Sequence, residues 1–437
     1  MNLPGEKDQE ASDRGVEAQG YTGGGIRSHY ILIVLFLLYI SNYGDRFVVS
    51  GMLEFIKRDW SLSDAQAGWL TTIVILFITI FTVPVAVLID RWSRRKMISM
   101  MVFLWSLATL ACAFTRNFGQ LLAARALTGI GESGFAPAGT ALLSAAYPEG
   151  KRAKVMGIWN IAIPLGVGAG MMAGGLIARR WGWQHAFGLV AVPGMLLALA
   201  SWFLPDYRSV TVEEPASGSG HLGGFLTRAT GLFRSPALVF TYLGFAMNVA
   251  VSTALMAWLP SYYERTGLAE PGGGGTYTMP ILGLVVVGAP LGGYLSDVWH
   301  RRRKEGRLVF PAITSVLGAV ILFVAFLCPG RMVQVGIMVL YGILATCYVA
   351  PAASVTQDLV HPGLRALSYG MCVIVQHLCG DVWSPVLVGW LSDQVGLASA
   401  VRVLPFFGIL GGVSFYAGSR FYLADLARVE NVELRAE

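Results

Sequence analysis

Twelve long apolar stretches follow one another along the chain, centred near residues 41, 77, 106, 131, 166, 194, 248, 288, 318, 344, 376 and 410. A helix rises about 1.5 Å per residue, so roughly 20 apolar residues cross the hydrocarbon core of a bilayer. Charged residues gather in the short connections between these stretches. The pattern predicts an all-α membrane protein with twelve spanning helices and almost no water-soluble domain.

The composition agrees with this pattern. Hydrophobic residues make up 55% of the chain, charged residues make up 13%, and the mean hydropathy is +0.60. A soluble fold could not bury so much apolar surface. The five cysteines all fall within predicted spans without metal-type spacing, so we interpret them as small apolar residues and expect no metal site: Cys112, Cys328, Cys347, Cys372 and Cys379.

The polar segments divide the chain into two halves. Residues 1–28 have no apolar core, which favours a disordered cytoplasmic tail over a signal peptide. Residues 205–235 form a cytoplasmic linker between six-span bundles at 29–204 and 236–424, and residues 425–437 form a second tail. Apolar residues at helical spacing from Phe225 to Phe233 predict a short amphipathic surface helix, with an unstructured loop as the alternative.

Lys and Arg residues are distributed unevenly between the two sides of the membrane. Of the 32, 22 lie on the side of the termini and 8 on the other side, while Arg46 and Arg125 lie within spans. The positive-inside rule therefore predicts that both termini are cytoplasmic. This bias accounts for the net charge of +6 and makes a nucleic-acid partner unnecessary.

A short basic motif occurs twice, 207 residues apart. Asp90, Trp92 and Arg94 recur at the same offsets as Asp297, Trp299 and Arg301. Such repeats predict two equivalent halves with a binding site at their interface. When the cytoplasmic side is closed, each aspartate could latch a gate by meeting the positive N-terminal end of a helix from the other half. Arg94 and Arg301 could take part in that gate, or could simply follow the inside rule.

Ionisable residues within spans indicate a functional path. A charge at the bilayer centre costs about 2.5–3.5 kcal/mol, so such groups usually face a bundle interior. Counting from the span centres places Asp45 and Arg125 within roughly 3 Å in depth, and Glu132 two turns deeper on the face of Arg125. We expect Asp45 and Arg125 to form an ion pair, so that one arginine serves two carboxylates.

These residues suggest proton coupling. Low dielectric favours a neutral carboxylic acid and a nearby guanidinium favours the carboxylate, so an arginine moving between partners would switch proton affinity. Glu132 is the expected proton carrier, Asp45 the second site and Arg125 the coupling cation. Arg46 points about 100° away from Asp45, and we favour Asp45 for the cavity. A static interhelical lock is the alternative role for Arg125 and Glu132.

Other residues complete the expected site. Arg46 and Arg125 would bind an anionic head group within an apolar trough, although each wall residue also fits ordinary packing: Tyr39, Asn42, Thr128, Phe135, Asn248, Tyr341 and Tyr348. His377 and Asp381 lie four apart on one helix face, where they could tune gating or form a structural pair. Closely spaced glycines in the fifth span permit close helix contact.

Several motifs resemble known families. Gly293-Tyr-Leu-Ser-Asp297 followed by Arg301 and Arg302 is similar to the loop signature of the major facilitator superfamily, although the first copy has Ala86 and Ser93 where glycines are usual. Three longer stretches resemble the Spinster family: 42–51, the Gly129-Ile-Gly-Glu132-Ser run with Ala162 to Gly166, and 377–385. The resemblance implies a major facilitator fold that moves lysophospholipids or sphingosine phosphate, in some members coupled to protons.

We therefore expect a monomeric lipid transporter that uses the proton gradient and needs no cofactor. The absence of an Asn-x-Ser/Thr sequon favours a bacterial inner membrane. A proton-coupled carrier of organic anions or drugs is the first alternative, and a ligand-sensing receptor is the second. An intramembrane enzyme is disfavoured, because Asp381 follows Leu378-Cys379-Gly380 and lacks the Gly-x-Gly-Asp pattern of intramembrane aspartyl proteases.

Overall fold

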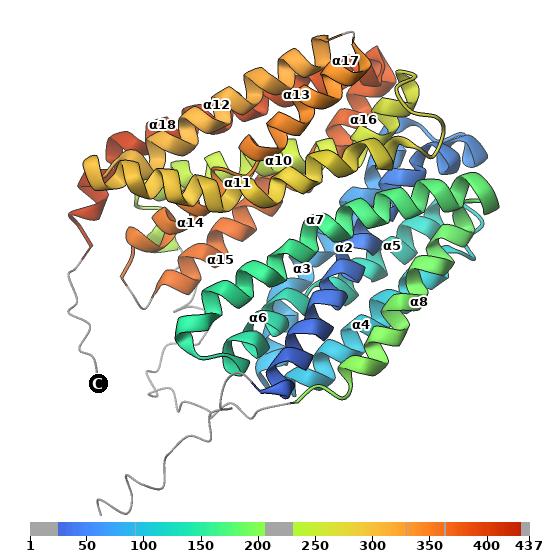
Figure 1. The fold of residues 1–437 in the computed structure, drawn as a ribbon, viewed down its shortest axis with the longest axis horizontal. Coiled ribbons are helices and arrows are strands. Elements are labelled where there is room, and N and C mark those ends of the chain that lie inside the picture. The colour runs from blue at the N-terminus through green and yellow to red at the C-terminus, as the bar shows by residue number, and fades with distance from the viewer. Residues whose placement is uncertain (1–24, 92, 206–229, 329, 362–363, 430–437) are drawn as a thin grey trace, which may run out of the picture.

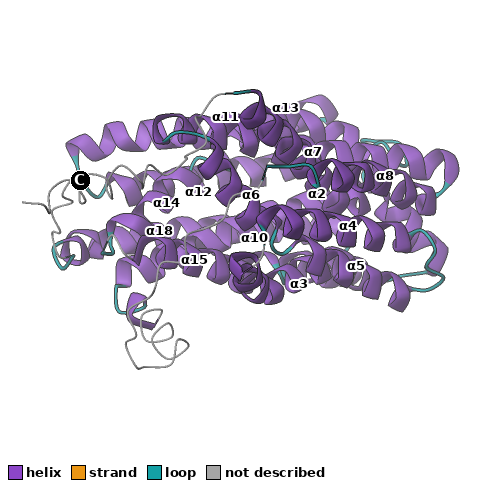
Figure 2. Cartoon of the chain, turned by 90° about the horizontal axis from the view of Figure 1, so that it is seen from below, coloured by secondary structure: helices purple, strands orange, loops and turns teal. Residues whose placement is uncertain are grey.

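The computed structural model describes residues 25–91, 93–205, 230–328, 330–361 and 364–429. Within these ranges the chain consists of helices joined by short connections (Figure 2). The N-terminal bundle contains α2 (Ile26–Trp60), α3 (Asp64–Arg91), α4 (Arg94–Cys112), α5 (Phe118–Glu132), α6 (Phe135–Ala146), α7 (Glu149–Trp181) and α8 (Trp183–Ser201).

The C-terminal bundle contains α10 (Pro236–Arg265), α11 (Gly274–Arg302), α12 (Gly306–Leu327), α13 (Arg331–Leu344), α14 (Val349–Asp358), α15 (Arg365–Gln376), the π-helical turn η2 (His377–Asp381), α16 (Ser384–Val395), α17 (Leu397–Ala400), the 3-10 turn η3 (Val401–Val403) and α18 (Leu404–Leu426). The prediction of an all-α protein with two pseudo-symmetric bundles is confirmed.

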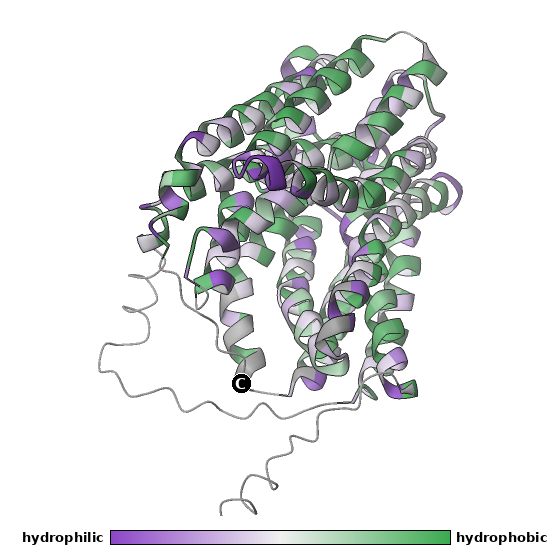
Figure 3. Cartoon of the chain, turned by 60° about the vertical axis from the view of Figure 1, so that its left-hand side comes forward, coloured by the Kyte–Doolittle hydropathy of each residue, from purple (hydrophilic) through white to green (hydrophobic). Residues whose placement is uncertain are grey.

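Eleven apolar helical segments in the described part of the chain are long enough to span a membrane. The fourth predicted crossing is made by α5 and α6, which are separated at Ser133 and Gly134. The tenth crossing has a similar break between α13 and α14. Large apolar side chains such as Leu196 and Phe203 are exposed on the outside of the molecule, and hydrophobic ribbon covers its outer helices (Figure 3).

Two boundaries differ from the sequence prediction. Helix α2 begins at Ile26, so the last residues of the expected 1–28 tail are helical. Residues 1–24 and 206–229 lie outside the described residues, and with them most of the expected amphipathic helix. Of that segment, residues 230–232 form the last helical turn before α10.

Helices α2 and α7 pack backbone against backbone. A Cβ added to Gly170 would lie 2.4 Å from the Gly44 carbonyl oxygen, and one added to Gly166 would lie 2.5 Å from the Ile40 carbonyl oxygen. A Cβ added to Gly174 would lie 2.3 Å from the Val48 carbonyl oxygen. Glycines spaced four apart therefore form the contact face of α7, as the sequence predicts for this span.

The two bundles meet at one end of the molecule. Their ribbons lie together where α7 and α11 pass each other and diverge toward the end where α2 begins and α18 ends (Figure 1). Gly175 and Gly272 lie in this contact, because a Cβ on Gly175 would be 2.2 Å from the Gly272 carbonyl oxygen. We call this end, which includes residues 54–64, 265–275 and 392–393, the closed end, and the other the terminal end.

Substitution of Gly170 by Leu should separate α2 from α7 and lower the stability of the folded protein by about 1–3 kcal/mol, the usual cost of overpacking. Thermal unfolding of the purified protein in detergent measures the change. Gly157→Leu on the same helix is the control, since a Cβ there has no neighbour within 4 Å among the described residues. Equal stability of the two variants would contradict this account of the α2–α7 contact.

Candidate functional site

The central feature of the site is an ion pair between α2 and the last residue of α5. Arg46 donates to Glu132 Oε2 from Nε at 3.0 Å and from Nη2 at 2.8 Å. The guanidinium also lies over the Tyr43 ring, 4.7 Å from its centroid. The Glu132 side chain is fully buried and the Arg46 side chain is 15% exposed. The cation therefore has one accessible face while its carboxylate is enclosed.

Arg125 makes a different set of contacts from those predicted. Its guanidinium donates to three backbone carbonyl oxygens, those of Leu70 at 3.2 Å, Asp45 at 2.9 Å and Arg46 at 2.9 Å. The expected ion pair with the Asp45 carboxylate is wrong, and so is the expectation that one arginine serves two carboxylates. The depth of each residue along its span correctly predicted that Arg125 of α5 lies beside Asp45 of α2. It could not predict whether the guanidinium would bind the side chain or the backbone of that residue.

Asp45 points into the bundle rather than toward the seam between the bundles. Its side chain is fully buried, and neither carboxylate oxygen has a hydrogen-bond partner in the described structure. The preference for Asp45 over Arg46 as the cavity residue is therefore wrong. Adjacent helix positions diverge by about 100°, and the carbonyl contacts of Arg125 fix which of the two turns inward.

Local backbone geometry explains how α5 reaches this position. A Cβ on Gly129 would lie 2.4 Å from the Val74 carbonyl oxygen, and one on Gly131 would lie 2.6 Å from the Trp105 backbone nitrogen. The two glycines let α5 approach α3 and α4 closely, just before the helix ends at Glu132. The Glu132 carboxylate thus lies at the break of the fourth crossing.

Among the predicted wall residues of the N-terminal bundle, only Asn42 joins the charged site. Its Oδ1 lies 3.5 Å from Arg46 Nη2. Tyr39 stacks on Trp159 with ring centroids 4.4 Å apart, and Phe135 is 1% exposed within the same aromatic cluster. Thr128 donates to the Ala124 carbonyl of its own helix. Tyr39, Phe135 and Thr128 are therefore packing residues in this conformation.

The wall residues of the C-terminal bundle lie apart from the charges. Asn248 donates to the Gly244 carbonyl oxygen at 2.8 Å. Tyr348 packs edge-on against Phe245 in the bundle core. Tyr341 is 6% exposed and borders a narrow apolar cavity of about 20 Å³. In this conformation the structure does not bring these three residues to the Arg46–Glu132 pair.

The predicted gate residues of the repeated motif give a mixed result. Asp297 accepts from Arg307 Nη2 at 3.4 Å, and Arg307 also pairs with Asp358, so this network lies within the C-terminal bundle. The expected contact of Asp297 with the other half belongs to the state in which this end is closed, so it stays a prediction. Arg301 is exposed. The side chains of Asp90 and Arg94 lie outside the described residues.

His377 and Asp381 pair as their spacing suggests. His377 Nδ1 lies 3.0 and 2.9 Å from the two Asp381 carboxylate oxygens. Both residues belong to the π-helical turn η2, which contacts α10 of its own bundle and α3 of the other. A single π-helical turn often marks a functional position in a helix. The pair therefore lies at the seam between the bundles.

The sequence interpretation missed a network that joins the bundles at the closed end. Asp64 Oδ1 and Oδ2 each accept from Arg265 at 2.7 Å, and Arg265 Nε also donates to Glu54 at 2.9 Å. Lys57 and Ser392 contact the same Asp64 carboxylate. We call Glu54, Lys57, Asp64, Arg265, Ser392 and Asp393 the closed-end latch.

Asp393 completes the latch through the backbone. Its two oxygens accept from the amides of Asp64 at 2.7 Å and Ala65 at 2.9 Å, at the N-terminus of α3. Ser63 and Gln66 form a capping box at the same helix start, which is visible in the sequence. The capping box locates the helix start, but nothing in the sequence connects it to residue 393.

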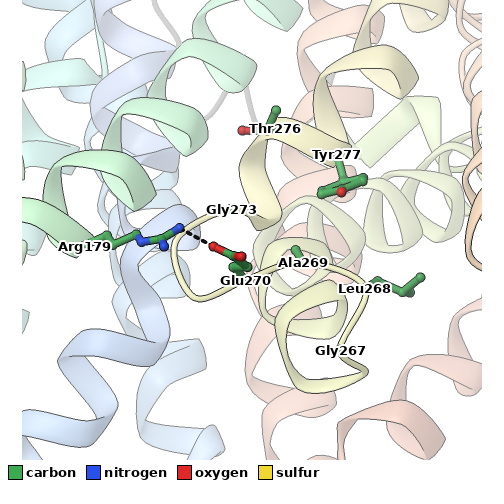
Figure 4. Close-up of a pocket in the computed structure, with 8 residues that line it drawn as sticks. All are labelled: Arg179, Gly267, Leu268, Ala269, Glu270, Gly273, Thr276 and Tyr277. Carbon is green, nitrogen blue, oxygen red and sulfur yellow. Dashed lines mark ion pairs between the residues drawn. The ribbon is translucent and has the colours of Figure 1, made fainter.

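A second contact between the bundles lies beside the latch. Arg179 Nη1 and Glu270 Oε2 are 2.7 Å apart (Figure 4), and both border a surface pocket of about 390 Å³. Their side chains are 53% and 74% exposed. An ion pair this exposed contributes little, about 0–1 kcal/mol, so the buried latch determines how firmly this end is closed.

Comparison with known proteins identifies the fold and the family. The family model described as Major Facilitator Superfamily matches residues 35–382. The chain belongs to this superfamily. Its members are membrane transporters, so the chain is a multi-pass transporter and not an enzyme, as predicted.

Similar proteins within the superfamily are Spinster homologues, which confirms the resemblance. The chain is 27% identical to Protein spinster homolog 1 of Xenopus tropicalis, across 97% of this chain and 87% of that protein. It is 25% identical to the mouse sphingosine-1-phosphate transporter SPNS2, across 91% and 78%. The crystal structure of a bacterial Spinster homologue in an inward-facing, unoccupied conformation has the same fold, with a TM-score of 0.80, 22% identity and coverage of 92% and 99%.

Replacement of Arg125 by Lys should destabilise this transporter, since an ammonium cannot satisfy three carbonyl oxygens with the geometry of a planar guanidinium. We expect a loss of about 2 kcal/mol or more in the free energy of unfolding, because buried acceptors lose a charged donor. Thermal unfolding in detergent measures it. Arg116→Lys, at an exposed position, is the control, and an equal effect of both substitutions would refute the role of Arg125.

Removal of the Arg265 guanidinium should loosen the closed end. Spin labels on Arg58→Cys and Gln394→Cys, both exposed positions on opposite bundles, report the separation in a background without native cysteines. Arg265→Gln should shift the distance distribution to longer values, whereas Arg179→Gln, which breaks only the exposed pair, should leave it nearly unchanged. An unaltered distribution in Arg265→Gln would show that the latch does not hold this end.

Proposed function

We propose that this transporter moves an amphiphilic lipid with an anionic head group across the membrane by alternating access, coupled to protons. The Arg46–Glu132 pair is the observation that carries the proposal. The Arg46 guanidinium is partly accessible, and it pairs with the buried Glu132 carboxylate. A lipid phosphate could replace that carboxylate as its partner, because a phosphate is a bidentate acceptor for a guanidinium just as a carboxylate is. The similarity to a sphingosine-1-phosphate transporter supports the choice of a lipid.

The coupling follows from the exchange of partners. When a lipid phosphate binds Arg46, Glu132 loses its counter-charge while it stays buried. A buried carboxylate without a partner favours its protonated form, so lipid binding and proton uptake accompany each other. Asp45 is the second proton site, and Arg125 supplies a fixed positive charge beside both carboxylates.

The orientation follows from the distribution of charge. The excess of Lys and Arg on the side of the termini supports cytoplasmic termini. The absence of an Asn-x-Ser/Thr sequon supports a bacterial inner membrane as the location. The closed-end latch then faces the outside, and the conformation is inward-facing. Loss of the latch contacts would accompany the opposite, outward-facing conformation.

Glu132→Gln should abolish the stimulation of lipid uptake by a pH gradient while leaving some downhill exchange. The measurement uses proteoliposomes with sphingosine-1-phosphate and lysophosphatidylcholine as separate probes, with and without an imposed gradient. Glu270→Gln, an exposed carboxylate at the closed end, is the matched control. Gradient-driven uptake that persists in Glu132→Gln would exclude Glu132 as the proton carrier.

Arg46→Gln should weaken binding of the phosphorylated probe by about tenfold to a hundredfold, because a hydrogen bond to a charged group contributes about 1.5–3 kcal/mol. Competition with an excess of a short organic acid, measured in the same vesicles, separates a lipid transporter from an organic-anion carrier. Strong competition by the acid would favour the carrier. Binding of a probe without any counterflow would favour a receptor.

A further inference from the structure

Among the buried polar side chains of the N-terminal bundle that lack a hydrogen-bond partner in the described residues, five form one group. They are Ser41 and Asp45 on α2, and Trp105, Ser106 and Thr109 on α4. The hydroxyl oxygens, both carboxylate oxygens and the indole Nε1 are inaccessible and make no hydrogen bond to any described residue. Buried polar groups in native proteins nearly always have a partner. We call these five residues the α2–α4 niche.

The members of the niche adjoin one another. Thr109 and Trp105 of α4 are neighbours of the Asp45 carboxylate, although no hydrogen bond joins either of them to it. Ser41 lies one helical turn from Asp45. Ser41 and Ser106 both lie beside Gly194 of α8. A Cβ added to Gly194 would lie 2.2 Å from Ser106 Oγ and 3.3 Å from Ser41 Oγ. The absence of a side chain on α8 therefore leaves room for both hydroxyls.

The niche is separate from the Arg46–Glu132 pair. Asp45 is fully buried, whereas the side chain of the neighbouring Arg46 is 15% exposed and pairs with Glu132. The charged and titratable groups that face Asp45 are Arg125 and Glu132 on α5 and Cys112 on α4. Arg125 directs its three hydrogen bonds to carbonyl oxygens, so it supplies charge without occupying the carboxylate.

The chemistry of the niche favours water over a metal ion. Three hydroxyls can each donate and accept, and the carboxylate accepts. The indole N–H of Trp105 is a donor only, so it cannot ligate an alkali cation, although it can donate to water or to the carboxylate. A buried water needs two to four polar partners, and this group supplies them.

We propose that the α2–α4 niche holds water molecules that hydrogen-bond the Asp45 carboxyl group and deliver its proton along a route separate from the lipid-binding seam. This rests on the proposed proton coupling. In the transfer, an O–H bond of a hydronium ion breaks and an O–H bond to an Asp45 oxygen forms, which leaves a neutral water and a neutral carboxylic acid.

The direction of the route follows α4. Ser99 lies two helical turns from Ser106 on the same helix face, toward the terminal end. Its hydroxyl oxygen is 2.9 Å from Ser201 Oγ of α8. A second pair of hydroxyls between α4 and α8 therefore lies two helical turns from the niche, toward the end where the bundles diverge.

The proposal is tested on the purified full-length protein by infrared difference spectroscopy, which follows the protonated carboxyl band during a pH titration and needs no lipid substrate. The wild type should show a titrating band that is lost in Asp45→Asn. Thr109→Val and Trp105→Phe each remove a hydrogen-bonding group that holds the water molecules around the carboxylate, so each should move the titration midpoint to higher pH by roughly one unit. Ser315→Ala, which removes a buried, unpartnered hydroxyl from the C-terminal bundle, should leave the midpoint unchanged.

A band that survives in Asp45→Asn, or midpoints that do not move in Thr109→Val and Trp105→Phe, would overturn the proposal. A midpoint that depends on sodium concentration would overturn it in favour of an alkali-ion site. Ser41→Ala and Ser106→Ala remove one oxygen each and provide the same test if the larger changes prevent folding. If vesicle uptake does not respond to a pH gradient while these shifts occur, the proposed function fails and the niche stands.

Discussion

The three carbonyl contacts of Arg125 set the geometry on which the rest of the N-terminal bundle depends. A fully buried guanidinium is costly unless its donors are satisfied, and here it joins α5 to consecutive carbonyls of α2 and to one of α3. Because Arg125 contacts the carbonyl oxygens of Asp45 and Arg46 themselves, it fixes the rotation of α2 about its axis at these two residues. One side chain must then turn inward, and the other must turn to the seam.

This arrangement keeps the buried charges in balance. The intramembrane charges of the N-terminal bundle are Arg46, Arg125, Asp45 and Glu132. Of these four, only Arg46 and Glu132 are hydrogen-bonded to each other through their side chains. Breaking a buried pair costs about 3–5 kcal/mol when one partner is left alone. Arg125 and Asp45 stay close without a direct bond, so each can change its interactions without the full cost of separating an ion pair.

The sequence predicted the architecture and the depth of the charges, because apolar length and helical rise are properties of the chain alone. It did not predict which atoms meet. Depth along a helix brought Arg125 to the level of Asp45, but rotation about the helix axis depends on packing of glycines such as Gly131 against α4. The latch was missed for another reason, since Asp64 and Arg265 lie at helix ends, where charges usually face water.

The closed-end latch differs in one respect from the charges of the N-terminal bundle, because some of its side chains are partly exposed. The Arg265 and Glu54 side chains are 27% and 24% exposed, so dissolved salt reaches them. At physiological ionic strength the Debye length is about 8 Å, and added salt shortens it and weakens the attraction between partly exposed charges. The equilibrium between the inward-facing and outward-facing conformations therefore depends on the ionic strength of the solution at the closed end. The ion pair of the buried Glu132 does not share this dependence.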